Sequence, residues 1–246
     1  MFYFLLAPTI TYNIILIIAA VIPAVFLMIK VYRSDRLGKE SPGLLFSLVR
    51  GGVLAALAAM LAERLFSWLL DLFLDEYSVA YNVLLYFGVV AVSEELAKYL
   101  FMRRYSWRSR EFTSAYDGVV YAVFTSLGFA LWENISYVLH FGFRTALVRA
   151  VTAIPGHACF GIFMGVFYGL ARKYEYAGKH TLSTACSVVG LICAVLLHGT
   201  YDYIASMEST GSGWIFAGFV AVLFAISYIT VSRASKNDEY IDVVVR

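Results

Sequence analysis

Seven long runs of apolar residues determine what this chain can fold into. They lie at residues 10–28, 44–70, 81–102, 116–139, 147–170, 182–206 and 214–231. A helix needs about 20 mainly apolar residues to cross the hydrocarbon core of a bilayer. Membrane barrels instead show segments of about 10 residues with alternating polarity, a pattern that is weak here. We therefore expect an all-α, polytopic integral membrane protein with about seven transmembrane helices.

The composition excludes the main soluble classes. Of the 246 residues, 61% are hydrophobic and 15% are charged, against about 25% charged residues in soluble domains. The net charge of +2 is too balanced to indicate a nucleic acid or an acidic partner. No repeat, linker or soluble domain is evident, so residues 1–246 are expected to form one helical membrane domain.

Basic residues cluster in alternate connections between the predicted helices. Fourteen of the 19 Lys and Arg residues lie in the first, third and fifth connections and in the C-terminal tail, whereas only Arg144 and Arg149 are assigned to the opposite side. Cytoplasmic loops retain Lys and Arg. This asymmetry predicts an N-terminus outside the cell and a cytoplasmic C-terminus.

A few ionisable side chains lie inside the predicted helices. Each one costs at least about 2.5–3.5 kcal/mol near the bilayer centre on insertion scales, so such residues are functional candidates by default. The second helix contains Arg50, Glu63 and Arg64, but the third to sixth helices carry the larger group: Glu94, Glu95, Lys98, Glu133, His157, His198 and Asp202. A shared cavity between these four helices, over residues 81–206, is the economical explanation.

Helical spacing predicts which of these side chains can meet. Glu94 and Lys98 are four residues apart, as are His198 and Asp202, so each pair shares a helix face. Glu95 points about 100° away from Glu94 and can meet a different helix. We expect one of these two carboxylates to be held as an anion by a base and the other to transfer protons.

Two neighbouring features concern the backbone. Asn134, beside Glu133, can bind a backbone carbonyl, position a water or cross-link helices. The Pro155-Gly156 step is expected to loosen the helix immediately before His157. The three cysteines, Cys159, Cys186 and Cys193, all lie in apolar runs and indicate small core residues rather than disulfides.

The order of these motifs resembles a known family. Glu94-Glu95-Leu96-Ala97-Lys98 is similar to an EExxK motif, Phe129 to Glu133 to FxxxE, His157 to an isolated histidine, and His198 to Asp202 to HxxxD. The set resembles the PrsW family of intramembrane proteases, in the superfamily of the CAAX prenyl endopeptidases and bacteriocin-processing enzymes. The resemblance covers residues 86–203, about half of the chain.

The resemblance implies hydrolysis of a peptide bond by a glutamate-activated water. Five residues are then candidates for catalysis: Glu94, Glu95, His157, His198 and Asp202. Glu94 would be the general base, His157 would orient or polarise the water, and His198 with Asp202 would stabilise the oxyanion. An ionised carboxylate cannot donate a hydrogen bond, so Asp202 would be protonated or would orient His198. Lys98, Glu133 and Asn134 would support these groups.

The resemblance also implies partners and location. The substrate would be a membrane-anchored protein, such as an anti-sigma factor, cut near its outer membrane border in a prokaryotic cell membrane. No cofactor and no nucleic acid are expected.

Two other mechanisms remain open at this stage. A catalytic zinc site takes three protein ligands and a water, and Glu94, His157 and His198 would supply them, although no HExxH motif is present. A proton-coupled transporter would also place charged pairs on successive helices. The absence of visible repeat symmetry argues against the transporter. Ser126 has no histidine or lysine at helical spacing, and cysteine chemistry would need Cys159 to meet a histidine across helices.

Overall fold

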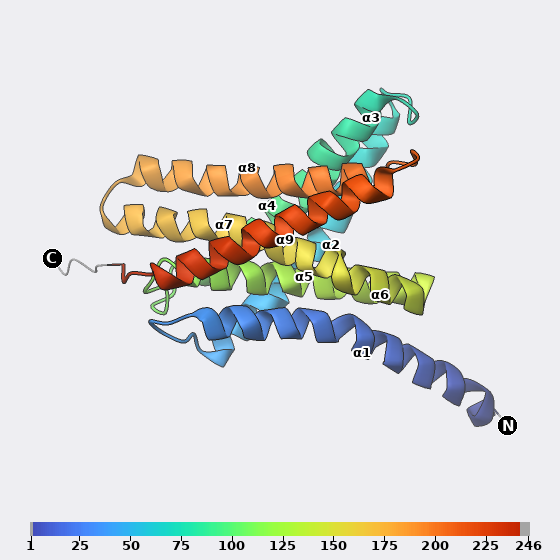
Figure 1. Cartoon of the computed structure of the whole chain (residues 1–246), viewed down its shortest axis with the longest axis horizontal. Coiled ribbons are helices and arrows are strands. Elements are labelled where there is room, and N and C mark those ends of the chain that lie inside the picture. Colours follow the sequence, from blue (N-terminus) through green and yellow to red (C-terminus); the bar gives the residue numbers. More distant parts are fainter. Residues whose placement is uncertain (1, 242–246) are drawn as a thin grey trace.

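The computed structural model describes residues 2–241 and consists of helices packed side by side (Figure 1). No strand occurs among these residues, where the only extended pairing is an isolated bridge between Ser114 and Tyr240. The helices, in chain order, are α1 (Phe2–Ser34), α2 (Pro42–Asp71), α3 (Val79–Val83), the π-helix η1 (Leu84–Ala91), α4 (Val92–Ser106), α5 (Asp117–Phe141), α6 (Phe143–Val151), α7 (Ala153–Tyr176), α8 (His180–Ala205) and α9 (Ser212–Lys236).

Seven helical segments are long and apolar enough to cross a membrane, as predicted. Five of these segments are single helices: α1, α2, α5, α8 and α9. A sixth segment consists of α3, η1 and α4 in continuous sequence, and the seventh consists of α6 and α7. Many large apolar side chains face outward along these segments, for example Phe46, Leu61 and Ile226. In a soluble protein such a surface would aggregate, whereas in a bilayer it contacts lipid.

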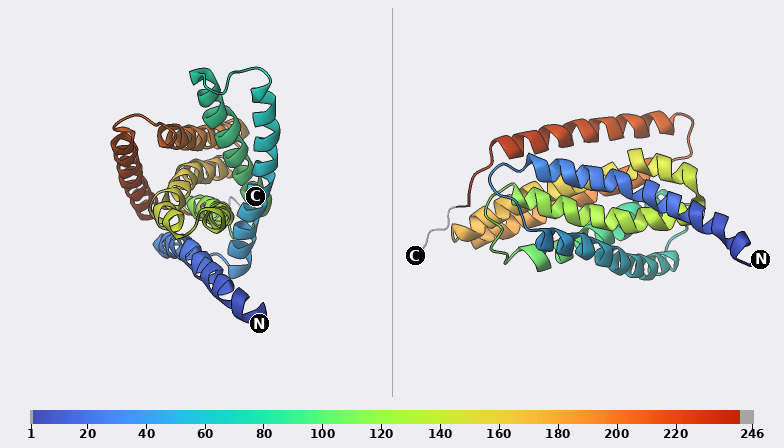
Figure 2. Two further views of the ribbon diagram at one scale, coloured as in Figure 1. Left: turned by 90° about the vertical axis from the view of Figure 1, so that its right-hand side faces the viewer. Right: turned by 90° about the horizontal axis from the view of Figure 1, so that it is seen from below.

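Burial differs strongly between the segments. In the most apolar stretch of α5, 78% of the residues are buried inside the protein, compared with 17% in α9. The two views in Figure 2 show α5 surrounded by other helices and α9 along one side of the bundle. α5 is therefore the central helix, and α9 is largely exposed to lipid.

Glycines bring α5 and α7 into close contact. Gly161, Gly165 and Gly169 recur every four residues on α7. A Cβ atom on Gly165 would lie 2.6 Å from the carbonyl oxygen of Gly118, and one on Gly169 would lie 2.0 Å from that of Ala115. Spacing small residues by four lets membrane helices approach at backbone distance. The close approach places α7, which carries His157, directly against α5, which carries Glu133.

Two irregularities lie next to the predicted site. The eight residues that precede Val92 form the π-helix η1. This geometry is rare overall and occurs often at functional sites. The backbone also breaks at Thr152 (φ −122°, ψ −71°), between α6 and α7. The prediction that the chain loosens at Pro155-Gly156 was wrong in position. Pro155 lies in the first turn of α7, where a missing N–H costs no helical hydrogen bond.

Loops and termini alternate between the two ends of the bundle (Figure 1). The α1–α2, α4–α5 and α7–α8 connections lie at one end, together with the end of α9. Most basic residues of the predicted cytoplasmic side lie at this end. Arg246, which was also assigned to that side, lies outside the described residues.

Candidate active site

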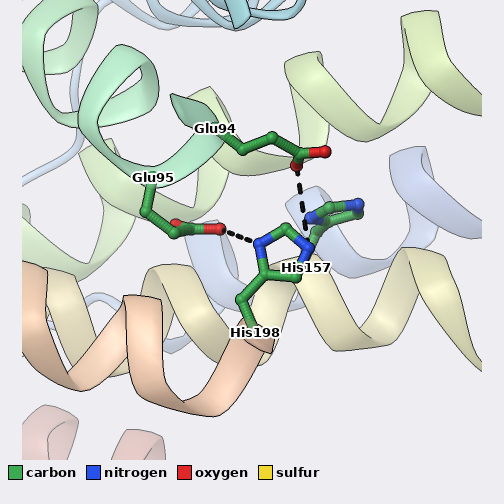
Figure 3. Close-up of side chains that lie close together, drawn as sticks. All are labelled: Glu94, Glu95, His157 and His198. Carbon is green, nitrogen blue, oxygen red and sulfur yellow. Dashed lines mark hydrogen bonds and ion pairs between the residues drawn. The ribbon is translucent and has the colours of Figure 1, made fainter. Parts of the chain in front are cut away.

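Two glutamates and two histidines from three helices meet inside the bundle. Glu94 and Glu95 lie on α4, His157 on α7 and His198 on α8 (Figure 3). One ligand atom from each residue lies within 4.8 Å of one from every other, and all four residues are buried. The structure thus brings together residues up to 104 positions apart, as a common cavity requires.

Lys98 holds three of these residues at once. Its ammonium nitrogen lies 3.1 Å from Glu94 Oε2, 2.7 Å from Glu95 Oε1 and 3.1 Å from His157 Nδ1. It also lies 4.0 Å from the ring centroid of Phe129, a cation–π contact. Helical spacing predicted the pairing with Glu94. The pairings with Glu95 and His157 are additional.

The contact with Lys98 determines the tautomer of His157. An ammonium group has three N–H donors and no acceptor, so Nδ1 of His157 must accept. The ring proton is then on Nε2, which donates to Glu133 Oε2 at 2.8 Å. Arg149 forms an ion pair with the same carboxylate oxygen at 3.0 Å. Both nitrogens of His157 are therefore engaged by protein groups.

His198 is held differently and keeps one nitrogen toward the cavity. Its Nδ1 donates to Glu95 Oε1 at 2.8 Å. Its Nε2 lies 3.2 Å from Asp202 Oδ2 and 3.8 Å from Glu94 Oε2. Figure 3 shows the ring between the two glutamates, with an interaction to each. Asp202 therefore lies close enough to His198 to act as its charge partner.

A cavity of about 500 Å³ opens beside this cluster. Glu94, His157 and His198 line it, whereas Glu95 and Lys98 do not. Glu95 has no exposed surface and Lys98 is 1% exposed. Further polar residues reach the cavity from α2, α5, α6 and α8: Glu63, Glu133, Arg149 and Asp202. The aromatic residues of its wall include Tyr86, Trp132, Tyr137 and Tyr201.

The π-helix η1 packs against α8 next to His198. A Cβ atom on Gly199 would lie 2.5 Å from Phe87, so only glycine permits this contact. Tyr86, on the same π-helix, lines the cavity. The ring of Phe160 on α7 stacks on the imidazole of His198, with centroids 4.8 Å apart. This stacking and the hydrogen bond from Nδ1 to Glu95 hold the imidazole in place before any substrate binds.

Asn134, a predicted supporting residue, does not line the cavity and bonds to α1 instead. Its side-chain N–H donates to the backbone carbonyl of Ala20 on α1 at 3.1 Å, and its oxygen accepts from Arg149 Nε at 3.0 Å. Asn134 therefore cross-links α1, α5 and α6, which is one of the three roles considered for it. Through Arg149 it contacts the partner of Glu133.

Sequence reasoning missed two cavity residues. Arg149 was assigned to an outer connection, but it lies on α6 and faces the cavity. Glu63 was noticed as a charge inside α2 and then set aside because no motif accompanied it. A carboxylate in an apolar helix was itself the signal. Arg149 gave no such signal, because a basic residue at a helix end usually extends to the membrane surface.

The donor atoms of the cluster suit a zinc ion by type. Two imidazoles and a carboxylate form a common catalytic zinc set. However, the Lys98 ammonium already lies within hydrogen-bonding distance of Glu94 and His157 Nδ1. A divalent ion that shared these ligands could bind only if the Lys98 side chain moved away or if its ammonium lost a proton.

Comparisons with known proteins agree on one family. The family model described as "PrsW family intramembrane metalloprotease" matches residues 40–231. A protein named "Protease PrsW" from Halalkalibacterium halodurans is 30% identical over 223 residues, covering 91% of this chain and 98% of that protein. One of the same name from Oceanobacillus iheyensis is 31% identical, covering 89% and 95%.

A third relative of that name, from Bacillus subtilis, is 35% identical over 123 residues, covering 50% of this chain and 53% of the relative. No solved structure matches. The family match extends beyond the motif region of residues 86–203 to include α2 and most of α9.

Proposed function

The chain belongs to the PrsW family of intramembrane proteases, and from that membership we propose that it cleaves a membrane-anchored protein with a water activated by Glu94. That it is a protease follows from the family and its relatives. The identity of the base, the roles of the other residues and the class of substrate are our proposals.

The orientation of Glu94 supports its role as the base. Of the two adjacent glutamates, only Glu94 lines the cavity. Its Oε2 lies 3.8 Å from His198 Nε2, which is too long for a direct hydrogen bond. A water at the cavity wall can bond to both atoms at once. A general base must reach the proton it removes directly or through one water, and Glu94 meets this condition.

The reaction then needs two proton transfers. Glu94 takes a proton from the water as its oxygen attacks the scissile carbonyl carbon, and a tetrahedral oxyanion forms. The N–H at Nε2 of a protonated His198, which is paired with Asp202, stabilises this oxyanion. The protonated Glu94 next gives its proton to the leaving amine nitrogen as the C–N bond breaks. The products are a carboxyl and an amino terminus, and Glu94 is an anion again.

Glu95, Lys98 and His157 are positioning residues in this scheme. Glu95 fixes His198 through Nδ1, and Lys98 balances the charge of both glutamates. Both nitrogens of His157 are engaged, so it orients Lys98 and Glu133 rather than the water. Glu95 was among the five catalytic candidates, and its burial behind His198 supports an indirect role instead.

A metal-dependent route uses the same residues. Glu94, His157 and His198 would hold the ion, and a bound zinc would supply a water of lowered pKa and a Lewis acid. The family description as a metalloprotease favours this second candidate. The Lys98 ammonium among the same ligands favours the metal-free route. A transporter function is not favoured, because the matched relatives are proteases.

The substrate we propose is a single-span protein of the anti-sigma-factor type, cut near its outer membrane border. The cavity is lined by Ala205 and Ser206, at the end of α8, and by Arg149 of α6. The distribution of basic residues assigns this end of the bundle to the outer side. A peptide bond near the outer border of a membrane-spanning helix could therefore reach Glu94.

Purified protein and a set of single-span substrates test the proposal. Glu94→Gln keeps the shape of the side chain but removes the base, and we expect a loss of about 10²–10⁴-fold in cleavage rate. Glu76→Gln, an exposed residue in the α2–α3 connection, is the matched control and should cleave normally. Mass spectrometry of the products locates the cut. Undiminished cleavage by folded Glu94→Gln would overturn the role of Glu94.

A further inference from the structure

A second group of buried carboxylates lies at the opposite end of the bundle. Asp35 follows α1, Glu40 precedes α2 and Asp117 begins α5. One oxygen from each lies within 4.8 Å of one from each of the others. Asp117 is 16 residues from Glu133 along α5, or about 24 Å at 1.5 Å per residue. This group is therefore separate from the candidate active site.

The oxygens of this group are only partly satisfied. Asp117 accepts hydrogen bonds from Thr113 N at 2.7 Å, Ser114 N at 2.9 Å and Ser114 Oγ at 2.8 Å. Oδ1 of Asp35 accepts from the backbone of Leu37 at 3.2 Å. In contrast, Asp35 Oδ2 and both carboxylate oxygens of Glu40 are buried and have no hydrogen-bond partner on another residue of the described chain.

Glu40 is the strongest indication that this group binds a ligand. Its side chain is buried, with 4% of the residue exposed, and it is aimed into the group. Buried polar atoms are nearly always paired, and buried charges are paired or bind metals. Burial, followed by the charge of Asp117, raises the pKa of Glu40 to about 8. An anionic Glu40 is thus costly unless a cation compensates it.

No cation of the described residues pairs directly with this group. Lys39 is near enough for its charge to lower the pKa of Glu40 in part, but its ammonium donates to the backbone carbonyls of Tyr32 and Asp35. No ion pair to Asp35, Glu40 or Asp117 occurs within residues 2–241. Three clustered carboxylates that share no ion pair favour bound protons or a bound cation.

We propose that Asp35, Glu40 and Asp117 bind a hard divalent cation, Ca²⁺ or Mg²⁺. Oxygen-only donors select these ions over zinc, which prefers nitrogen and sulfur. Two oxygens on opposite sides of a Ca²⁺ ion are about 4.6–5.2 Å apart, twice the usual metal–oxygen distance. One oxygen from each carboxylate lies within 4.8 Å of one from each of the others, so a single ion between them can contact all three, and waters would complete the coordination shell.

The cation would join three elements at one end of the bundle. Asp35 ends the α1 segment, Glu40 lies one residue before the Ser41 cap of α2, and Asp117 starts the central helix. Tyr116, beside Asp117, donates from its hydroxyl to the carbonyl of Val31 on α1. A cation at this point would fix α1 and α2 against α5, so its role is structural.

Direct binding to the full-length protein tests the proposal. The protein is purified in detergent, stripped with EDTA, and equilibrated with radioactive Ca²⁺, or with Mg²⁺ measured by elemental analysis. The variants are Glu40→Gln and, as matched control, Glu239→Gln, whose exposed carboxylate lies at the same end and pairs with Lys173. Thermal unfolding is followed with and without each ion, because a ligand of the folded state raises the unfolding temperature.

Wild type and Glu239→Gln should bind one ion per chain and unfold at a higher temperature when it is present. Glu40→Gln should bind it at least about tenfold more weakly, since loss of even an outer metal partner costs 10–100-fold. Should Glu40→Gln fail to fold, the wild-type titration and Asp35→Asn decide. The proposal is overturned if wild type binds neither ion, if Glu40→Gln binds as tightly as the control, or if only zinc binds.

Discussion

The buried ammonium of Lys98 provides a quantitative test of the site. Lys98→Met keeps a side chain of similar length but removes the charge that contacts Glu94, Glu95 and His157 Nδ1 at 2.7–3.1 Å. Two glutamates, each less than one-tenth exposed, then lose their shared counter-charge. Removing one partner of a buried ion pair costs about 3–5 kcal/mol. We expect a loss of this size in the free energy of unfolding.

The same change should also remove activity. Without Lys98, the paired carboxylates can stay buried only by taking up a proton, and a protonated Glu94 cannot act as a base. His157 Nδ1 also loses its donor, so the hydrogen bond that orients the ring toward Glu133 weakens. Cleavage should therefore fall even in the fraction of molecules that remains folded.

A second variant restores the charge balance and isolates the electrostatic effect. Glu95→Gln in the Lys98→Met background removes one of the two carboxylates, but its amide oxygen can still accept from His198 Nδ1. If the reasoning is right, the double variant is more stable than Lys98→Met, and the double-mutant cycle gives a coupling of up to about 3 kcal/mol.

Unfolding in mixed detergent and SDS micelles measures these free energies. If Lys98→Met lowers the free energy of unfolding by less than about 1 kcal/mol, the range of an exposed ion pair, the prediction of a buried charge cluster is refuted. Additive effects of the two substitutions would refute the coupling between Lys98 and Glu95.

Three further predictions concern packing and orientation. Gly52→Ala should destabilise the protein by about 1–3 kcal/mol, because a Cβ atom there would lie 2.0 Å from the carbonyl oxygen of Thr125. Gly218→Ala is the control, because a Cβ atom there meets no atom within 4 Å. Equal thermal stability of the two variants would contradict the close α2–α5 contact. Asn134→Ala should cost about 1–3 kcal/mol, because it removes the hydrogen bond to the Ala20 carbonyl and leaves Arg149 Nε without its acceptor. An unchanged unfolding midpoint would argue against this cross-link. A cysteine at Asp75 should react with an impermeant maleimide on intact cells and one at Ser109 should not, in a background without the native cysteines; the reverse pattern would invert the assigned topology.

The sequence was sufficient for the membrane helices and for most of the site. Apolar runs identify membrane helices directly because a bilayer leaves few alternatives for the backbone. The cost of a charge in lipid likewise marked Glu94, Glu95, Lys98, His157 and His198 as candidates. In the structure Lys98 bonds to Glu94, Glu95 and His157, and Glu95 bonds in turn to His198.

Features that depend on packing between helices could not be predicted. Helical spacing pairs Lys98 with Glu94, but only the position of α7 shows that Lys98 also meets His157. The π-helix η1 has no local signature in its apolar sequence, and its close contact with α8, at Phe87 and Gly199, depends on how the two helices pack. Arg149 lies near the start of the fifth apolar run and was counted with the basic residues of the outer side, whereas the structure places it on α6, facing the cavity.

The unpaired carboxylates at Asp35 and Glu40 were also beyond sequence reasoning. Both lie in a polar connection, where acidic residues normally face solvent. Their burial becomes visible only when the α1–α2 and α4–α5 connections are seen to meet.

We propose above all that Glu94, in a cluster balanced by Lys98, activates water without a metal ion. The most direct test measures zinc content and cleavage activity in the same purified sample after treatment with a zinc-selective chelator. Ca²⁺ is kept in the buffer so that the carboxylate group at the opposite end remains filled. We predict full activity at a zinc content far below one ion per chain. Activity that disappears with the zinc and returns when one equivalent is restored would contradict the claim.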